Sequence, residues 1–199
     1  SVLSNRNLQW LLLVCGFVGL ILRVQTAAAW PLQNDEAVHL YRSWVLATEG
    51  TYQYTPWTHG PFLYYVSALV MPKANWDFFA GRMITSLLWL PSLMGLYWLR
   101  DRIGRLTVAV AATLLSLHHY VVWMSTYFRN DIILISILLL WLGVAVLYFQ
   151  TPTVGRALGL GTLGALSITV KETSFLIAFV LVCTAVSWYL WVHGTTLTA

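Results

Sequence analysis

The chain has 199 residues, of which 59% are hydrophobic and only 9% are charged, and its formal net charge is +4. Soluble domains carry about a quarter charged residues, so the composition excludes an ordinary soluble domain and indicates an integral membrane protein. The lysines and arginines form no basic run, which excludes nucleic acid as a partner and leaves membrane orientation as their main role. We expect an all-α fold in which residues 1–199 form a single transmembrane domain, a bundle of about six helices.

Six apolar segments are long enough, or nearly long enough, to cross a bilayer as helices. In chain order they are residues 8–30, 78–99, 106–128, 132–149, the shorter 157–170, and 174–192. Arg23 and Arg82 lie inside the first two segments. We expect these two arginines to neutralise acids of the outer face or to hold the outer loop.

The long loop at 31–77 has structure of its own. A helix is expected over 35–47, and Asn34 or Asp35 can cap its start. The apolar run 61–71 is too short to cross a membrane and is followed by a proline. We therefore expect a re-entrant or interfacial helix there.

The placement of arginines predicts the orientation of the spans. One arginine precedes the first span, three lie in the turn RDRIGR at 100–105, and one lies in the loop QTPTVGR before the fifth span. Short cytoplasmic loops carry an excess of Lys and Arg. We therefore expect a multi-pass protein of the cell membrane with a cytoplasmic N-terminus and with the loop 31–77 outside.

The same orientation brings a set of ionisable residues to the outer face. Charged side chains at membrane depth are costly, so they usually have partners and often a function. The set, which we take as the candidate site, is Asp35, Glu36, His39, His59, Arg82, Arg129, Asp131 and Lys171.

The motif NDEAVH at 34–39 has three interpretations. A general base must accept a proton from a positioned hydroxyl, and one of two adjacent acids can be tuned to that task by its environment. Alternatively, Asp35 caps a helix and interacts favourably with its N-terminus. Asp35 and His39 also have a spacing that can hold a divalent metal if Glu36 or His59 lies nearby. No further ligand cluster is evident, so no cofactor is firmly expected and a divalent metal remains an option.

Three later motifs carry a histidine or a cation. In THGP, the Gly-Pro after His59 predicts a turn and a helix start at the proline. The ring then lies either at an anion-binding helix N-terminus or in solvent. In YFRND, Arg129 either holds a phosphate bidentately or pairs with Asp131. In TVKETS, Lys171 either provides a charge for phosphate or pairs with Glu172, and the short helix before it favours phosphate.

The ordered set DE…H, HGPF, FRND and KET, with this topology, resembles the N-terminal half of GT-C-type membrane glycosyltransferases. It is similar to the dolichyl-phosphate-mannose protein mannosyltransferases, the bacterial aminoarabinose transferases and the predicted mannosyltransferases described as flippase activity-associated proteins. The family's Asp-Glu pair is matched by Asp35 and Glu36. Its His-Pro-Pro-Leu-like motif is matched from His59 onward, with Gly60 in place of the first proline. An arginine shortly before an aspartate, and a lysine in a later outer turn, are matched by Arg129, Asp131 and Lys171.

The resemblance implies a polyprenyl-phosphate-linked sugar of the mannose type as donor. It implies inverting transfer on the outer face to a hydroxyl of a protein, lipid or glycan. Asp35 would be the base, and Glu36 would position Asp35 or the acceptor. Arg129 and Lys171 would stabilise the leaving phosphate, and His59 would assist there. Asp131, His39 and Arg82 are the further residues expected to bind the substrate or its phosphate. Membrane lipids and other membrane proteins are the remaining expected partners.

Members of this family have more spans than this chain, and many carry a C-terminal outer domain. We therefore expect a fragment or a shortened relative. The alternative to an enzyme is a catalytically inactive lipid-binding or scaffold subunit of a membrane assembly. A small transporter is not expected, because the two halves of the sequence show no inverted repeat.

Overall fold

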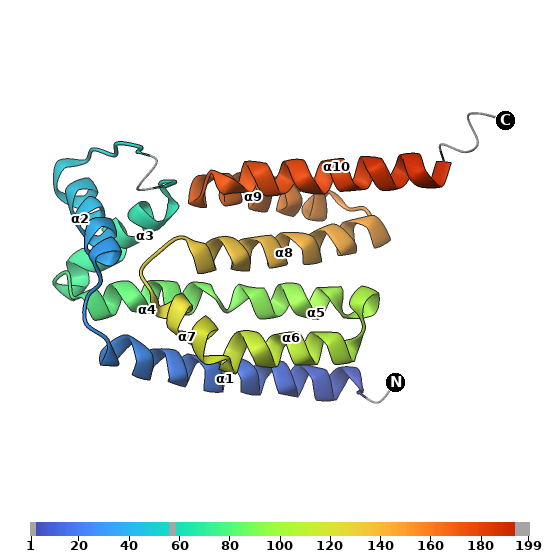
Figure 1. Cartoon of the computed structure of the whole chain (residues 1–199), viewed down its shortest axis with the longest axis horizontal. Helices are drawn as coiled ribbons and strands as arrows, with labels where there is room; N and C mark the ends of the chain where they lie inside the picture. Colours follow the sequence, from blue (N-terminus) through green and yellow to red (C-terminus); the bar gives the residue numbers. More distant parts are fainter. Residues whose placement is uncertain (1–2, 56–58, 194–199) are drawn as a thin grey trace.

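The structure, a computed structural model, describes residues 3–55 and 59–193, and all regular structure in these two ranges is helical. Most helices run side by side along the long axis of the molecule, whereas α2 and α3 gather at one end (Figure 1). In chain order the elements are α1 (Asn5–Ala29), α2 (Asn34–Glu49), α3 (Phe62–Val70), the 3-10 helix η1 (Met71–Ala74), α4 (Phe78–Leu88), α5 (Pro91–Ile103), α6 (Arg105–Leu117), α7 (His119–Thr126), α8 (Asp131–Gln150), α9 (Val154–Val170) and α10 (Thr173–His193).

Several of these helices are suited to cross a membrane. In the described part of the chain, four segments are long and apolar enough: Asn5–Ala29, Phe78–Ile103, Asp131–Gln150 and Thr173–Val192. A fifth is present if α6 and α7, which are bent by 59°, form one broken span. α9 is apolar but has only 17 residues. The all-α class is confirmed, and the count of six spans stays a prediction.

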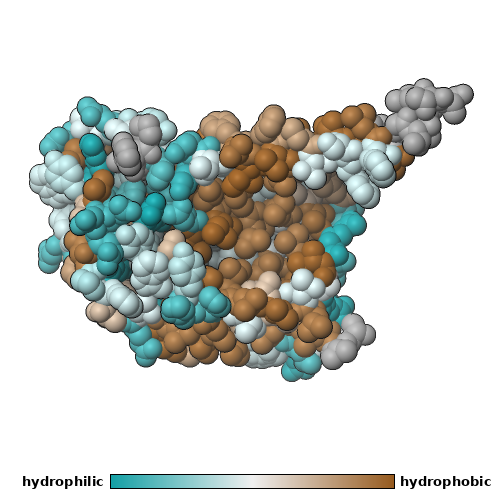
Figure 2. All heavy atoms as spheres, in the orientation of Figure 1, coloured by the Kyte–Doolittle hydropathy of each residue, from teal (hydrophilic) through white to brown (hydrophobic). Residues whose placement is uncertain are grey.

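The surface of the bundle is apolar. Figure 2 shows hydrophobic residues over the middle of the visible face and many hydrophilic residues at the end that carries α2 and α3. Large side chains such as Phe17 and Phe179 are exposed on the helices. Soluble monomers rarely expose apolar patches of this extent, so the surface supports a multi-pass membrane protein.

The outer layer, formed by α2, α3 and η1, contains the two helices expected from the sequence, although the cap of the first one differs. α2 spans Asn34–Glu49, but its N-cap is Gln33, so the expected cap by Asn34 or Asp35 is wrong. α3 begins directly after its N-cap Pro61, as the Gly-Pro pair predicts. With nine residues α3 is too short to cross a membrane.

The charged loops separate to the two ends of the bundle. The start of α1, the α5–α6 turn and the α8–α9 turn lie at one end (Figure 1). The α1–α2, α7–α8 and α9–α10 connections lie at the other end, beside α2 and α3. The arginines assigned to the cytoplasm therefore share one end, opposite the candidate site. The orientation of the two ends in a cell membrane stays a prediction.

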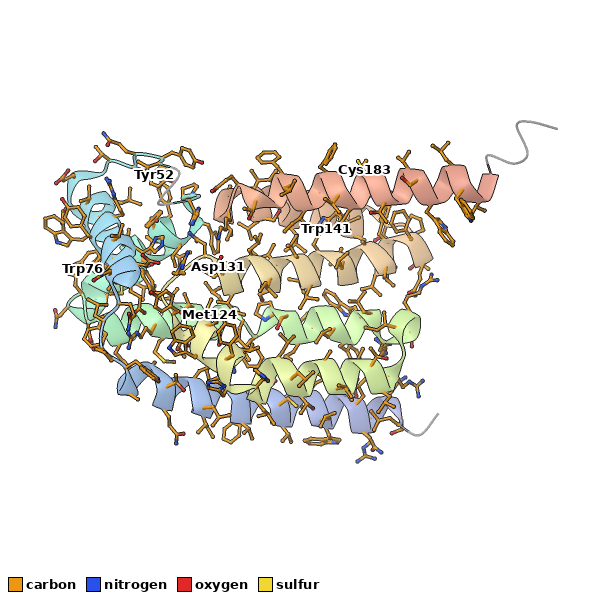
Figure 3. The ribbon with its side chains drawn as sticks, viewed as in Figure 1. Tyr52, Trp76, Met124, Asp131, Trp141 and Cys183 are labelled. Atoms are coloured by element: carbon orange, nitrogen blue, oxygen red, sulfur yellow. The ribbon has the colours of Figure 1, made fainter. Side chains whose placement is uncertain are left out.

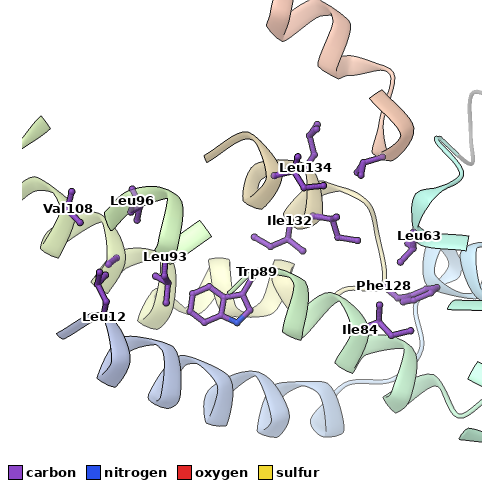
Figure 4. Packing of buried hydrophobic residues seen from close by; sticks show 14 of the residues in the cluster. Leu12, Leu63, Ile84, Trp89, Leu93, Leu96, Val108, Phe128, Ile132 and Leu134 are labelled. Carbon is purple, nitrogen blue, oxygen red and sulfur yellow. The ribbon is translucent and has the colours of Figure 1, made fainter. Parts of the chain in front are cut away.

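Close backbone packing joins α5 and α8 in the centre of the bundle. A Cβ at Gly95 would collide with the carbonyl of Leu139, and a Cβ at Gly143 would lie 2.9 Å from the carbonyl oxygen of Gly95. Small residues of this kind let helices approach closely in membranes, where packing drives association. The hydrophobic core of the bundle contains the buried rings of Trp89 and Phe128 (Figure 4).

Two of the predicted spans are broken helices. The segment 78–99 divides into α4 and α5 at Trp89 and Leu90, where Pro91 opens α5. Proline at the first position of a helix needs no hydrogen bond from its nitrogen, so this break follows from the sequence. The segment 106–128 divides at His118, between α6 and α7, where neither proline nor glycine occurs.

Arg23 stabilises the second break. Its guanidinium donates to the carbonyl oxygens of Leu115 at 2.8 Å, Ser116 at 3.1 Å and Gly19 at 2.9 Å. It also lies 3.7 Å from the centre of the Trp89 ring. The last carbonyls of a helix lack intrahelical donors and attract a cation. The expectation that Arg23 neutralises an outer acid or holds the outer loop is wrong, because among the described residues it binds the end of α6 and no carboxylate.

Candidate functional site

The start of α2 is fixed by Glu36. The backbone N–H of Gln33 donates to Oε2 at 3.1 Å, and that of Phe128 donates to Oε1 at 3.0 Å. Arg82 adds a bidentate ion pair, with Nε 2.9 Å from Oε1 and Nη2 2.6 Å from Oε2. The carboxylate side chain is 0% exposed and that of Arg82 is 4% exposed. A buried charge of this kind needs all its bonds, and Glu36 has them.

Arg82 also holds the chain between α1 and α2. Its Nη1 donates to the carbonyls of Ala27 at 2.9 Å and Trp30 at 2.7 Å, and its Nη2 donates to that of Pro31 at 2.9 Å. With the two bonds to Glu36, all five N–H groups of the guanidinium are in use. Arg82 thus neutralises an outer acid and holds the outer loop, as expected. Neither it nor Glu36 offers a free group to a substrate, so we assign both to positioning instead of the expected substrate-binding and catalytic roles.

Four charged side chains form a second cluster, which we name the charge chain: Asp35, Arg129, Asp131 and Lys171. Arg129 Nη1 lies 3.2 Å from Asp35 Oδ2, and Arg129 Nε lies 3.4 Å from Asp131 Oδ2. Lys171 Nζ donates to Asp131 Oδ1 at 2.6 Å. Figure 3 shows Asp131 at the end of α8 nearest to the outer layer. The prediction that these four residues meet at one end of the bundle is confirmed.

The members of the charge chain differ in exposure. The side chain of Asp35 is 58% exposed, that of Asp131 31%, that of Arg129 29% and that of Lys171 15%. Asp35 pairs with one cation, whereas Asp131 lies between two. Asp35 is therefore the most accessible carboxylate of the charge chain. The two cations are partly buried, where an anion binds more strongly than in water.

His59 is held in a conformation that is unfavourable for a residue with a side chain. Its φ is +60°, in the left-handed region. Three contacts hold this segment. Tyr52 Oη donates to the His59 carbonyl at 2.7 Å, and His59 Nδ1 lies 2.9 Å from Glu172 Oε1. The N–H of Gly60 donates to the carbonyl of Val170 at 3.3 Å. His59 is thus a fixed member of the site and not a solvent-facing turn residue.

The structure gives a reason for glycine at position 60, where the His-Pro-Pro-Leu-like motif has a proline. A Cβ at this position would collide with the carbonyl group of Thr169 at the end of α9. A proline would introduce the same collision and would remove the N–H that binds Val170. Glycine therefore lets the loop dock directly on α9, close to Lys171.

His39 lies on the buried side of α2 and is 3% exposed. Its Nδ1 is 2.5 Å from Tyr64 Oη, and its ring stacks on that of His59 with 6.4 Å between centroids. Burial, reinforced by the charges of Arg129 and His59, lowers the pKa of His39 to about 4. The ring is therefore neutral at pH 7. It can orient its neighbours, but it brings no positive charge to the expected substrate-binding role.

Three residues of the site were not found from the sequence: Glu172, Tyr52 and Tyr64. The expected alternative of a Lys171–Glu172 pair is wrong, because Lys171 binds a carboxylate of α8 and Glu172 binds His59. Burial alone would raise the pKa of Glu172, but hydrogen bonds from its own backbone and from His59 outweigh this and lower it. The tyrosines carry no signal in a chain with 10 of them.

The metal option receives no support from the described residues. No group of three or more His, Cys, Asp or Glu side chains suited to a metal ion occurs among them. Asp35 turns to Arg129, and His39 turns to Tyr64. The chemistry available in the described part of the site is that of three partly exposed carboxylates (Asp35, Asp131 and Glu172), two cations and two imidazoles.

The chain matches no protein-family model, no curated protein and no solved structure.

Proposed function

We propose that this protein transfers a sugar from a polyprenyl-phosphate donor to a hydroxyl acceptor, at the membrane surface where α2 and α3 lie. The observation that carries the proposal is the charge chain, in which the exposed carboxylate of Asp35 pairs with Arg129, and the less exposed carboxylate of Asp131 joins Arg129 to Lys171. A base and a pair of phosphate ligands, held at the end of a bundle of apolar helices, suit a reaction whose leaving group is a lipid phosphate. The order of the motifs, which resembles GT-C glycosyltransferases, supports the same reaction.

Asp35 is the proposed general base. Such a base must come within hydrogen-bond distance of the acceptor hydroxyl, and the side chain of Asp35 is exposed in the first turn of α2. Glu36 is less suited to this role because it is buried and already accepts four hydrogen bonds, and Asp131 because it lies between two cations. The ion pair of Glu36 with Arg82 fixes the turn that presents Asp35, and rigid elements of this kind hold a catalytic group in place.

Arg129 and Lys171 are the proposed phosphate ligands. The planar guanidinium binds phosphate oxygens in pairs, and the ammonium provides three donors on one charge. Each cation uses only some of its donors for Asp35 or Asp131. An incoming phosphodiester would share the remaining donors. The ring of His59, oriented by its contact with Glu172, provides a further polar group on the side of α9.

The proposed reaction is a single displacement. The acceptor oxygen bonds to the anomeric carbon while its proton passes to Asp35. The bond between that carbon and the phosphate oxygen breaks with its electron pair, and the anomeric configuration inverts. The polyprenyl phosphate leaves with one more negative charge than it had in the donor. Arg129 and Lys171 stabilise this charge from fixed positions, a type of contribution that is often the largest in catalysis.

The proposed cellular arrangement follows from the arginines. Because positive charge is retained in the cytoplasm, the end with the α5–α6 and α8–α9 turns is placed there, with the N-terminus. α2, α3 and the charge chain then face the outside of the cell membrane. The partners are the lipid-linked sugar, the hydroxyl acceptor, membrane lipids and other membrane proteins.

A transfer assay with a lysine variant and its matched control tests the phosphate site. The protein is reconstituted in nanodiscs with radiolabelled polyprenyl-phosphate mannose, and label leaving the lipid is measured. We expect Lys171→Met to lower the rate by about 10²–10³-fold, as for loss of one donor to a developing oxyanion. Lys73→Met, which removes an exposed lysine of the outer layer, should act like wild type. Donor binding by wild type without any transfer would instead identify an inactive lipid-binding subunit.

A further inference from the structure

A pocket lies on the outer layer, on the side of α2 away from the bundle core. Its volume is about 190 Å³, below the roughly 300–1,000 Å³ of pockets that hold drug-sized ligands. It therefore has room for one small ring and not for a long chain. Its wall includes Tyr41, Arg42 and Glu49 of α2, and Tyr52 and Gln53 of the following loop.

Two opposite charges in this pocket have no partner within the described residues. Neither Arg42 nor Glu49 forms an ion pair there, with the other or with a third group. Glu49 is also the last residue of α2, where a negative charge is unfavourable for the helix. These charges therefore contribute little to the stability of α2. Both are free to bind a ligand with donors and acceptors.

The remaining wall of the pocket is aromatic and amide. Tyr41 is exposed and stacks on Trp44 with 6.1 Å between ring centroids. Tyr52 and Gln53, from the loop after α2, also line the pocket. A flat ring beside a carboxylate, a guanidinium and an amide suits a sugar, whose C–H face packs on an aromatic ring and whose hydroxyls both donate and accept. A peptide side chain would need a deeper apolar pocket or a single charge to select it.

The pocket is aligned with the proposed base. Asp35, Arg42 and Glu49 are separated by seven residues each, so they lie along one face of α2 about 10.5 Å apart at 1.5 Å per residue. Tyr52 links the pocket to the charge-chain side of the layer, because its hydroxyl donates to the carbonyl of His59 at 2.7 Å. A chain of sugar units lying along this face would therefore present one hydroxyl to Asp35 and a unit further along the chain to the pocket.

We propose that the pocket between Arg42, Glu49, Tyr41 and Tyr52 is a carbohydrate subsite, and that the acceptor of the reaction is a glycan. The role of the bound glycan as acceptor rests on the proposed transferase function, whereas sugar binding in the pocket does not. The pocket selects the acceptor at a distance from the reacting hydroxyl. The donor phosphate binds separately, at the charge chain.

Saturation-transfer NMR on the protein in nanodiscs tests this subsite, with methyl α-mannoside as the first probe and a serine-containing peptide as the second. We expect saturation of the sugar ring protons by wild type. Arg42→Met and Glu49→Gln should weaken sugar binding about tenfold or more, since each removes hydrogen bonds to a charged group. Arg102→Met, an exposed arginine at the opposite end of the molecule, is the matched control and should bind like wild type.

The Asp35→Asn variant separates this proposal from the proposed function. It should bind the sugar as wild type does and fail in transfer. Sugar binding that is lost in the two pocket variants, in a protein without transferase activity, would support the subsite and overturn the proposed function. Unchanged sugar binding in Arg42→Met and Glu49→Gln would overturn the subsite whether or not the protein transfers sugar. Binding of the peptide in place of the sugar would also overturn it.

Discussion

Replacement of Glu36 by Gln tests whether the buried ion pair with Arg82 holds the outer layer on the bundle. The carboxylate accepts two bonds from Arg82 and one each from the backbone N–H groups of Gln33 and Phe128. A glutamine has one acceptor oxygen in place of two, and its NH₂ group would face N–H groups that can only donate. The guanidinium would also lose its counter-charge. Removal of one partner of a buried pair costs about 3–5 kcal/mol, and we expect a loss of this size in the free energy of unfolding.

The assay is a dodecyl sulfate titration in mixed micelles, followed by circular dichroism of the helices. Asp35→Asn is the matched control, because it makes the same chemical change one residue earlier, on a side chain that is 58% exposed. Exposed ion pairs contribute about 0–1 kcal/mol, so the control should stay within that range. Equal, small losses in both variants would refute the reasoning. They would mean that water or other groups replace the Glu36 carboxylate.

Two further predictions concern the histidine loop and the buried ring of His39. Gly60→Ala should lower both the thermal stability and the transfer rate, because its Cβ would collide with the Thr169 carbonyl. Gly155→Ala, at an open helical position, should be neutral or stabilising in the same melts. The pKa of His39 is about 4 when folded and about 6.5 when unfolded. The unfolded state therefore binds the extra proton, and stability falls as the pH drops from 6.5 toward 4. Between pH 7.5 and pH 5, the free energy of unfolding should fall by about 2 kcal/mol more in wild type than in His39→Gln. Equal pH profiles would contradict a neutral buried ring.

The positions of the helices follow from the sequence more closely than their breaks. Segment 132–149 was predicted and α8 spans Asp131–Gln150, because a long apolar run leaves the backbone no other way to satisfy its hydrogen bonds in lipid. The α4–α5 break carries its own local signal, a proline. The break at His118 carries none. At this break, Arg23 of α1 satisfies carbonyls at the end of α6, a contact between segments that are distant in sequence.

The membership of the charge chain could be predicted, whereas most of its pairings could not. The contact of Arg129 with Asp131 is local in sequence. Those of Arg129 with Asp35 and of Lys171 with Asp131 join distant helices. The order of two adjacent acids also does not say which is buried, because one residue turns a helix by about 100°. The packing of α2 on Arg82 decides that Glu36 faces inward and Asp35 outward.

The most direct test of the proposed function is the chemical step of Asp35→Asn, with Asp77→Asn as the control. Asparagine keeps the shape of Asp35 but cannot take up the acceptor proton. Asp77 is an exposed N-cap of α4, and asparagine caps a helix about equally well. With radiolabelled polyprenyl-phosphate mannose already bound, the single-turnover rate constant of transfer should fall by about 10²–10⁴-fold in Asp35→Asn. Donor affinity should remain, and Asp77→Asn should react at the wild-type rate. Transfer by Asp35→Asn at the wild-type rate would contradict the assignment of Asp35 as the base.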